Sequence, residues 1–119
     1  MTYVDGLIVP VSKKKLAAYR AMSIKAGKVW REHGALSYTE CAADDVKVGK
    51  RTSFPRSVKL KPGETVVFSW ITYKSRAQRD RTMAKVMKDK RLAAMMNPKA
   101  MPFDGKRMIF GGFKTFVSL

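Results

Sequence analysis

Residues 64–81 read ETVVFSWITYKSRAQRDR and contain the pattern of a strand followed by the start of a helix. Positions 65–73 carry no charged residue, and the β-branched and aromatic side chains there are typical of a strand covered on both faces. We therefore predict a central strand. Ser75 stands three residues before Gln78, which is the spacing of a capping box. In that motif the serine hydroxyl accepts from a free amide of the first turn and Gln78 reaches back, so a helix is expected to begin there.

Hydrophobic periodicity assigns the elements that precede this stretch. Residues 3–11 alternate between two sets of side chains and predict a first strand. Residues 13–33 place apolar side chains at helical spacing on one stripe, which predicts a surface helix docked on a sheet, with Gly34 as its left-handed cap. Residues 35–43 alternate again and predict a second strand.

The elements after the central strand complete the pattern. The helix that begins after Ser75 is expected to run to Met96, where Asn-Pro at 97–98 ends it. A last strand begins near Arg107, and the glycine pair at 111–112 within it indicates a bulge or a close backbone approach.

The resulting order, strand, helix, strand, strand, helix, strand, is that of a ferredoxin-like βαββαβ fold of the α+β class with a four-stranded antiparallel sheet. A chain of 119 residues suffices for one core, so a single domain is expected over residues 1–119. Residues 44–63 form a connection of roughly 20 residues, too long to be passive, and two interpretations are a lid and an arm that contacts a partner.

The charge balance is strongly basic. Lys and Arg number 25 against 9 acidic residues, which gives a formal net charge of +16. Such a charge attracts anionic partners such as nucleic acid, but a plain basic surface has the same composition. The basic residues are spread over both helices and the long loop, and the sheet lacks the aromatic pattern of an RNA-recognition sheet, so nucleic-acid binding is not favoured.

Compartment and processing signals point to a soluble cytoplasmic protein. Cys41 is the only cysteine, which excludes an intrachain disulfide, fits a reducing compartment and suggests a small core residue. The first residues lack the features of a signal peptide, and no apolar run approaches the roughly 20 residues that span a membrane. No membrane association is expected.

Several segments of the chain resemble one bacterial family. They are YVDG at 3–6, EHGAL at 32–36 with YTEC at 38–41, ADD at 43–45, VVFSWI at 66–71 and MPFDGKRMIFGGF at 101–113. Together they cover nearly the whole chain and are similar to the YbaA-like proteins of unknown function. The resemblance implies a homodimeric α/β barrel, in which two ferredoxin-like sheets face each other across a cavity, and it implies no established activity. Lys90 stands where a proline is expected in the family, which makes a helix break there less expected.

His33 is the one candidate for catalysis, and Glu40 is a candidate for ligand binding. His33 is the only histidine and lies on the apolar stripe of the first helix, where it is either a base or ligand-binding group at a cavity mouth or a hydrogen-bonded helix-end residue. Glu40 shares its strand face with Leu36 and Tyr38 and therefore either points into the enclosed side or lies at an exposed sheet edge. An enclosed carboxylate either pairs with a cation or has a raised pKa.

Other candidates for ligand binding lie in the long loop and the central strand. Phe54 and Arg56 have the composition of an aromatic plug and a fixed cation for an anionic group, and Phe54 serves equally as a dimer anchor. The set of candidate ligand-binding residues is His33, Tyr38, Glu40, Phe54, Arg56 and Trp70.

No motif identifies a reaction. One histidine and one cysteine leave no zinc set, and no phosphate loop or nucleophile elbow is present, so no metal or cofactor is expected. The prediction is a protein that binds a small ligand in the barrel cavity. The alternatives are a cofactor-independent monooxygenase-like enzyme with His33 as base, and a weak polyanion binder.

Overall fold

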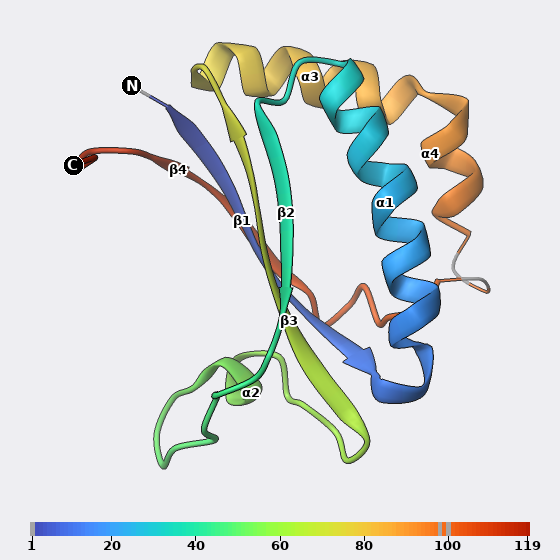
Figure 1. The fold of residues 1–119 in the computed structure, drawn as a ribbon, viewed down its shortest axis with the longest axis vertical. Helices are drawn as coiled ribbons and strands as arrows, with labels where there is room; N and C mark the ends of the chain where they lie inside the picture. Colours follow the sequence, from blue (N-terminus) through green and yellow to red (C-terminus); the bar gives the residue numbers. More distant parts are fainter. Residues whose placement is uncertain (1, 98, 100) are drawn as a thin grey trace.

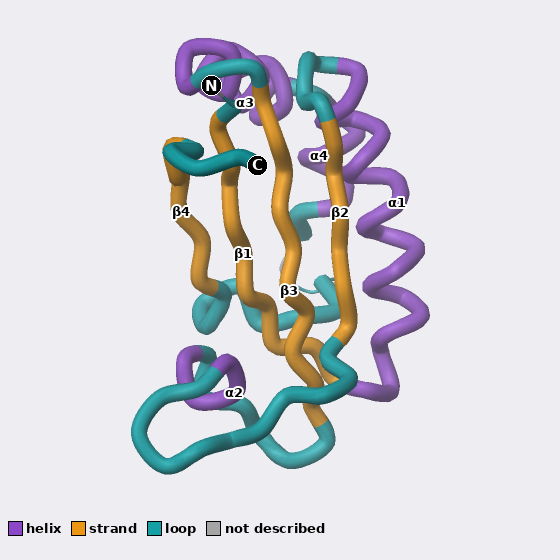
Figure 2. The backbone as a smooth tube through the Cα atoms, turned by 60° about the vertical axis from the view of Figure 1, so that its left-hand side comes forward, coloured by secondary structure: helices purple, strands orange, loops and turns teal. Residues whose placement is uncertain are grey.

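A four-stranded antiparallel sheet carries three of the helices on one of its faces (Figure 1). The computed structural model describes residues 2–97, 99 and 101–119. The elements are β1 (Tyr3–Ser12), the 3-10 turn Lys13–Lys15, α1 (Leu16–Glu32), β2 (Ser37–Ala42), α2 (Phe54–Ser57), β3 (Glu64–Tyr73), α3 (Arg76–Lys88), α4 (Lys90–Met95) and β4 (Ile109–Lys114). The strand order is β2-β3-β1-β4 (Figure 2). This confirms the ferredoxin-like prediction and places β3 in the interior of the sheet.

The core lies between the sheet and helices α1, α3 and α4. Strand alternation turns Val9 and Val67 toward the helices, where they pack with the buried Tyr19, and Val29 of α1 packs against Val86 of α3. Each of these five side chains is buried. Alternating residues of the strands thus supply one layer of the core, and the apolar stripe of α1 supplies the other.

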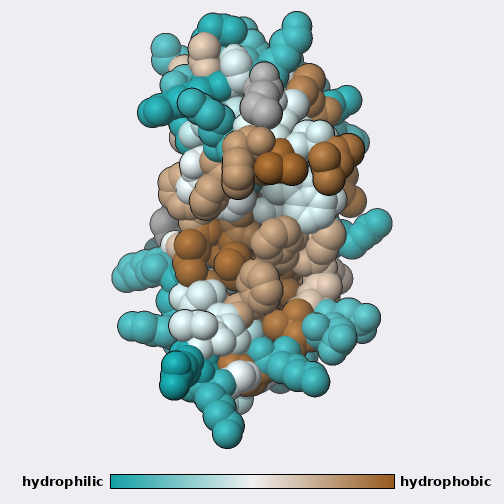
Figure 3. All heavy atoms as spheres, turned by 90° about the vertical axis from the view of Figure 1, so that its left-hand side faces the viewer, coloured by the Kyte–Doolittle hydropathy of each residue, from teal (hydrophilic) through white to brown (hydrophobic). Residues whose placement is uncertain are grey.

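The opposite face of the sheet is open. Phe68, Ile109 and Phe113 are 42%, 41% and 63% exposed there. Figure 3 shows apolar side chains gathered across the middle of this face, between hydrophilic side chains at its two ends. The expectation that the central strand is covered on both faces is therefore wrong for the single chain. Cys41 is also exposed, not part of the core, because strand alternation turns it away from the helices, opposite Phe68.

The two helix ends predicted from sequence are confirmed, with one correction. Gly34 follows α1 with φ +123°, and a Cβ atom there would collide with Gln78 and lie 2.9 Å from Thr82 Oγ1, so only glycine fits. Ser75 caps α3 by accepting from the backbone N–H of Gln78 at 3.1 Å. The side chain of Gln78 does not reach back to Ser75, because its amide donates to Thr82 Oγ1 at 3.4 Å.

The predicted continuous helix to Met96 is divided at Asp89. The backbone of Asp89 is extended, with ψ 124°, and its side chain caps α4 by accepting from the N–H of Arg91 at 2.9 Å. The helix therefore breaks even though position 90 is lysine and not proline. The Asp89 side chain caps the first turn of α4 and so stabilises a new helix start there.

The glycine pair of β4 marks a close approach, as predicted. A Cβ at Gly112 would collide with the side chains of Tyr3 and Arg79. The space at Gly112 lets Arg79 reach across the sheet end, where its Nε donates to Asp5 Oδ1 at 3.0 Å while Tyr73 donates to Asp5 Oδ2 at 3.0 Å. Asp5 is only 5% exposed, so this is a buried charge with one cationic partner.

Candidate functional site

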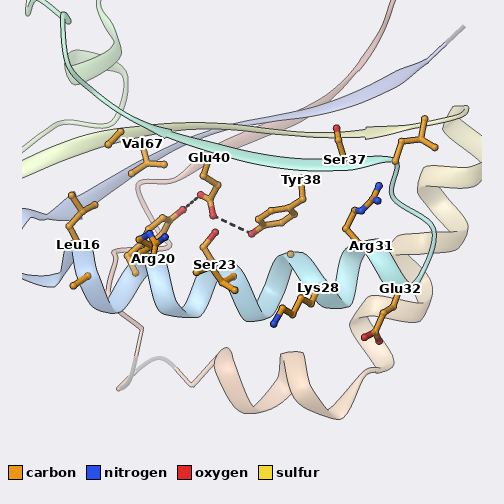
Figure 4. A pocket seen from close by; sticks show the side chains of 16 residues that line it. Leu16, Arg20, Ser23, Lys28, Arg31, Glu32, Ser37, Tyr38, Glu40 and Val67 are labelled. Atoms are coloured by element: carbon orange, nitrogen blue, oxygen red, sulfur yellow. Dashed lines mark hydrogen bonds between the residues drawn. The ribbon is translucent and has the colours of Figure 1, made fainter.

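An open groove of about 1150 Å³ runs between α1 and β2 on the helix-bearing side of the sheet (Figure 4). Strand β2 is at the edge of the sheet, so the groove opens beside it. Apolar side chains such as Leu16, Ile24 and Val67 form much of its wall, and polar groups from α1 and β2 face one another within it.

Glu40 is the polar centre of this groove. Its side chain extends from β2 toward α1 (Figure 4), where Tyr19 donates to Oε1 and Tyr38 donates to Oε2 at 3.3 Å. Tyr19 is only 6% exposed, and Ser23 points toward the same carboxyl from the next turn of α1. We call Tyr19, Glu40 and Tyr38 the Glu40 cluster.

The local sequence explains how the cluster forms. Tyr38 and Glu40 are two residues apart in β2 and so lie on the same face, while Tyr19, Ser23 and Gly27 lie one turn apart along α1. A Cβ at Gly27 would lie only 2.7 Å from the ring of Tyr38. Because Gly27 has no side chain, the Tyr38 ring can pack directly against α1.

The environment changes the pKa of all three members of the cluster. Burial raises the pKa of the Glu40 carboxyl, and the hydrogen bonds from Tyr19 and Tyr38 offset only part of that effect. Burial, reinforced by the charge of Glu40, raises the pKa of both tyrosine hydroxyls well above the usual range. The groove therefore holds a carboxyl that is more basic than usual beside two hydroxyls that stay neutral.

The rim of the groove is positively charged. Arg20, Lys28 and Arg31 of α1 line it, and Arg31 donates to the carbonyl of Ala35 at 3.3 Å. Figure 4 shows Arg31 extending toward β2 and Lys28 pointing away from it. Within the described part of the chain, neither Arg20 nor Arg31 has a carboxylate partner. The rim thus offers two guanidinium groups to an anionic ligand.

Two of the sequence-predicted site residues, Tyr38 and Glu40, lie in the groove, and the other four lie elsewhere. Phe54 and Trp70 are on the opposite side of the sheet, where both pack on Phe68. The ring centroid of Phe68 lies 5.8 Å from that of Phe54 and 5.6 Å from that of Trp70. Arg56 donates to the carbonyl groups of the loop at Val48 and Gly49, so its guanidinium holds residues of the 44–63 connection together.

His33 lies at the C-terminal end of α1 and is hydrogen-bonded through Nε2 to Asp89 Oδ2 at 2.9 Å. A hydrogen bond from Arg91, and to a smaller extent one from His33, holds the pKa of Asp89 below its usual range. His33 is not among the side chains that line the groove. Its contact joins the end of α1 to the cap of α4, which is a structural arrangement.

Replacing His33 with glutamine should lower the melting temperature by several degrees, because a flexible amide side chain loses more conformational freedom than an imidazole ring when it holds the contact with Asp89. Thermal unfolding of the wild type and the variant measures this. Ligand binding in the groove should not change. An unchanged melting temperature combined with lost ligand binding would instead assign His33 a direct role.

The described residues contain no group of three or more His, Cys, Asp and Glu side chains that could hold a metal ion. None of the helices in this part of the chain has the length and apolar character required to cross a membrane.

These features define a ferredoxin-like α+β protein with a polar-centred groove beside an edge strand. The chain belongs to the family described as "Protein of unknown function (DUF1428)", whose model matches residues 2–105. It is 48% identical over 117 residues to the uncharacterized protein YbaA of Escherichia coli K12, with 98% of each chain covered, and equally similar to that of Shigella flexneri. The resemblance to YbaA-like proteins is confirmed.

Solved structures support the fold alone. Rv0793 from Mycobacterium tuberculosis superposes with a TM-score of 0.60 at 14% identity, covering 99% of this chain and 98% of that one. A protein from Nitrosomonas europaea, provisionally assigned as an antibiotic biosynthesis monooxygenase, gives 0.59 at 12% identity, covering 96% and 89%.

Proposed function

We propose that this protein binds a small organic ligand in the groove between α1 and β2, with the Glu40 carboxyl as the polar anchor. The observation that carries the proposal is the position of Glu40, a carboxyl of raised pKa held by two tyrosines inside an open groove. A half-buried carboxyl without a cationic partner costs stability, and groups with a shifted pKa cluster at functional sites.

The remaining groove residues suit a ligand with an apolar body and an acidic hydroxyl group. Leu16, Ile24 and Val67 supply apolar wall, and Arg20 and Arg31 supply positive charge at the rim. The volume of about 1150 Å³ is ample for a small organic molecule with some water. Apolar walls with a few convergent polar groups are typical of small-molecule sites.

Replacing Glu40 with glutamine should weaken ligand binding by about tenfold or more, because it removes a hydrogen-bonding charge from the centre of the groove. A panel of phenols and other neutral hydroxyl compounds, screened by thermal shift and followed by calorimetry, supplies the ligand. Asp45→Asn is the matched control, since Asp45 is an exposed loop carboxylate. Equal binding by both variants would show that Glu40 is not the anchor.

The same Glu40→Gln change should increase the free energy of unfolding at neutral pH. The folded-state pKa of Glu40 lies above its unfolded value, so its contribution to stability is complete below the unfolded pKa and is lost as pH rises through the folded pKa. Glutamine does not ionise and avoids this loss. Urea denaturation at a series of pH values should therefore show the stability gain of the variant growing as pH rises above about 4.5. A gain that shrinks over that range would contradict the raised pKa.

The open face of the sheet supports a second part of the proposal, that two chains pair face to face as a homodimer with the expected α/β-barrel arrangement. Phe68 and Phe113 are exposed there, and contiguous apolar surface of this kind marks interaction sites. Phe54 and Trp70 adjoin Phe68, so they would act in the dimer contact rather than in the groove.

A cofactor-independent monooxygenase is the second candidate function. The basic carboxyl of Glu40 supports it, because oxygenation without a cofactor requires a base beside an easily oxidised substrate, and Glu40 replaces His33 as the candidate base. The fold similarity to the Nitrosomonas europaea protein is compatible with it. Dioxygen would be the co-reactant. With any ligand that the panel identifies, an oxygen electrode should record oxygen consumption by the wild type and none by Glu40→Gln. If the wild type consumes no oxygen, the monooxygenase function is excluded for that ligand and only ligand binding remains.

A further inference from the structure

We propose that the Glu40 cluster ionises a bound phenol or enol: Glu40 takes the hydroxyl proton of the ligand, and the tyrosine hydroxyls that Glu40 releases donate to the resulting oxyanion. The inference rests on the proposed ligand site and assigns it a ligand class. In the step, the O–H bond of the ligand breaks, its electron pair stays on the ligand oxygen, and a new O–H bond forms on Glu40. The step needs no oxidant or reductant.

The geometry of the two tyrosines supports this exchange. Tyr19 donates to Oε1 from α1 and Tyr38 donates to Oε2 from β2, so each carboxylate oxygen has one donor and retains acceptor capacity for a ligand. Protonation removes the negative charge that strengthens these bonds. The two hydroxyls then lie next to a neutral carboxyl and a new anion, and the anion is the better acceptor.

The groups around Glu40 leave it available as a base. Tyr19 and Ser23 face it from α1, Tyr38 adjoins it on β2, and Ser69 of β3 is its direct neighbour across the strand pair. No cationic side chain of the described residues bonds to Glu40. The carboxylate is therefore not held ionised by an ion pair, which would oppose its protonation.

The rim charges favour the products of the transfer. Proton transfer moves one negative charge from Glu40 onto the ligand without changing the net charge of the groove. Arg20 and Arg31 line the same groove, and neither is neutralised by a carboxylate within the described residues. Their positive charge in the lining of the groove favours an anion bound there, although one oxyanion cannot bond both, since they are about three turns apart on α1.

The pKa directions agree with these roles. Burial raises the pKa of Glu40 and makes its carboxylate a stronger base than an exposed glutamate. The pKa of Tyr19 and of Tyr38 is raised well above the usual range, so both remain protonated donors at the pH values used to study a phenol.

The test uses 4-nitrophenol, whose phenolate has its own absorption band, and 4-nitroanisole, which has the same ring without the proton. Excess wild-type protein should lower the apparent pKa of 4-nitrophenol by about one unit, a tenfold shift toward phenolate at fixed pH. Glu40→Gln should abolish the shift, Tyr38→Phe should reduce it, and Asp45→Asn should leave it unchanged. Circular dichroism of each variant checks its fold.

Three results would overturn the inference. The first is that 4-nitrophenol binds the wild type but keeps the pKa that it has free in solution. If both probes bind in that case, the proposed ligand site is still supported. The second is an undiminished shift in Glu40→Gln, which would assign the effect to the rim arginines alone. The third is no binding of either probe, which would exclude the ligand class, while the wider panel still decides whether the groove binds another small molecule.

Discussion

Replacing Arg79 with leucine should lower the free energy of unfolding by about 3–5 kcal/mol, because it leaves a buried carboxylate without its cationic partner. Asp5 is 5% exposed and accepts from Arg79 Nε and from the Tyr73 hydroxyl, each at 3.0 Å. The guanidinium also lies over the ring of Tyr3, 5.1 Å from its centroid. Leucine replaces some of the packing volume but none of the charge, so only Tyr73 would remain to bond Asp5.

A neighbouring arginine provides the control for this prediction. Arg76 lies on the same helix, is 73% exposed and approaches Asp80 only to 3.8 Å, so Arg76→Leu should change stability by no more than about 0.5 kcal/mol. The double variant Asp5→Asn with Arg79→Leu should recover part of the loss, because it removes the unpaired charge. Urea denaturation measures all three. A loss in Arg79→Leu no larger than that of Arg76→Leu would contradict the role of the buried pair.

The fold could be predicted because it depends on local periodicity. The alternation of β1 and β2, the helical stripe of α1 and the cap at Ser75 each occur within a few neighbouring residues. The break at Asp89 could not be predicted in the same way. No proline marks it, and the carboxylate of Asp89 that caps α4 is also held by His33, 56 positions earlier in the chain.

The candidate site was predictable only in part, for a similar reason. Alternation predicts that Tyr38 and Glu40 share one face of β2, and only the structure shows that this face is turned toward α1. Tyr19 belongs to the apolar stripe of α1, and no local pattern indicates that its hydroxyl donates to Glu40 on a different element. Gly27 was the available signal, since glycine inside a helix costs up to about 1 kcal/mol and so indicates a close approach, in this structure by Tyr38.

Replacing Phe68 with aspartate should convert the proposed homodimer into a monomer. Phe68 is 42% exposed on the open face and packs on the rings of Phe54 and Trp70. The strand register continues this apolar surface across β1 to Ile109 and Phe113 of β4. A face-to-face pair would bury a carboxylate at this position among apolar groups, which is strongly unfavourable without a cationic partner. In a monomer the same carboxylate stays in water at little cost.

The control and the salt dependence make this prediction specific to the open face. Met87 of α3 is 56% exposed on the helix-bearing side, so Met87→Asp adds the same charge and should leave the dimer intact. Each chain carries a formal charge of +16, so two chains repel, and added salt should strengthen the wild-type dimer by screening that repulsion. Sedimentation equilibrium at micromolar concentration and several salt concentrations measures the mass. A wild type that stays monomeric at every salt concentration would rule out the homodimer, and a Phe68→Asp variant that stays dimeric would place the interface on another surface.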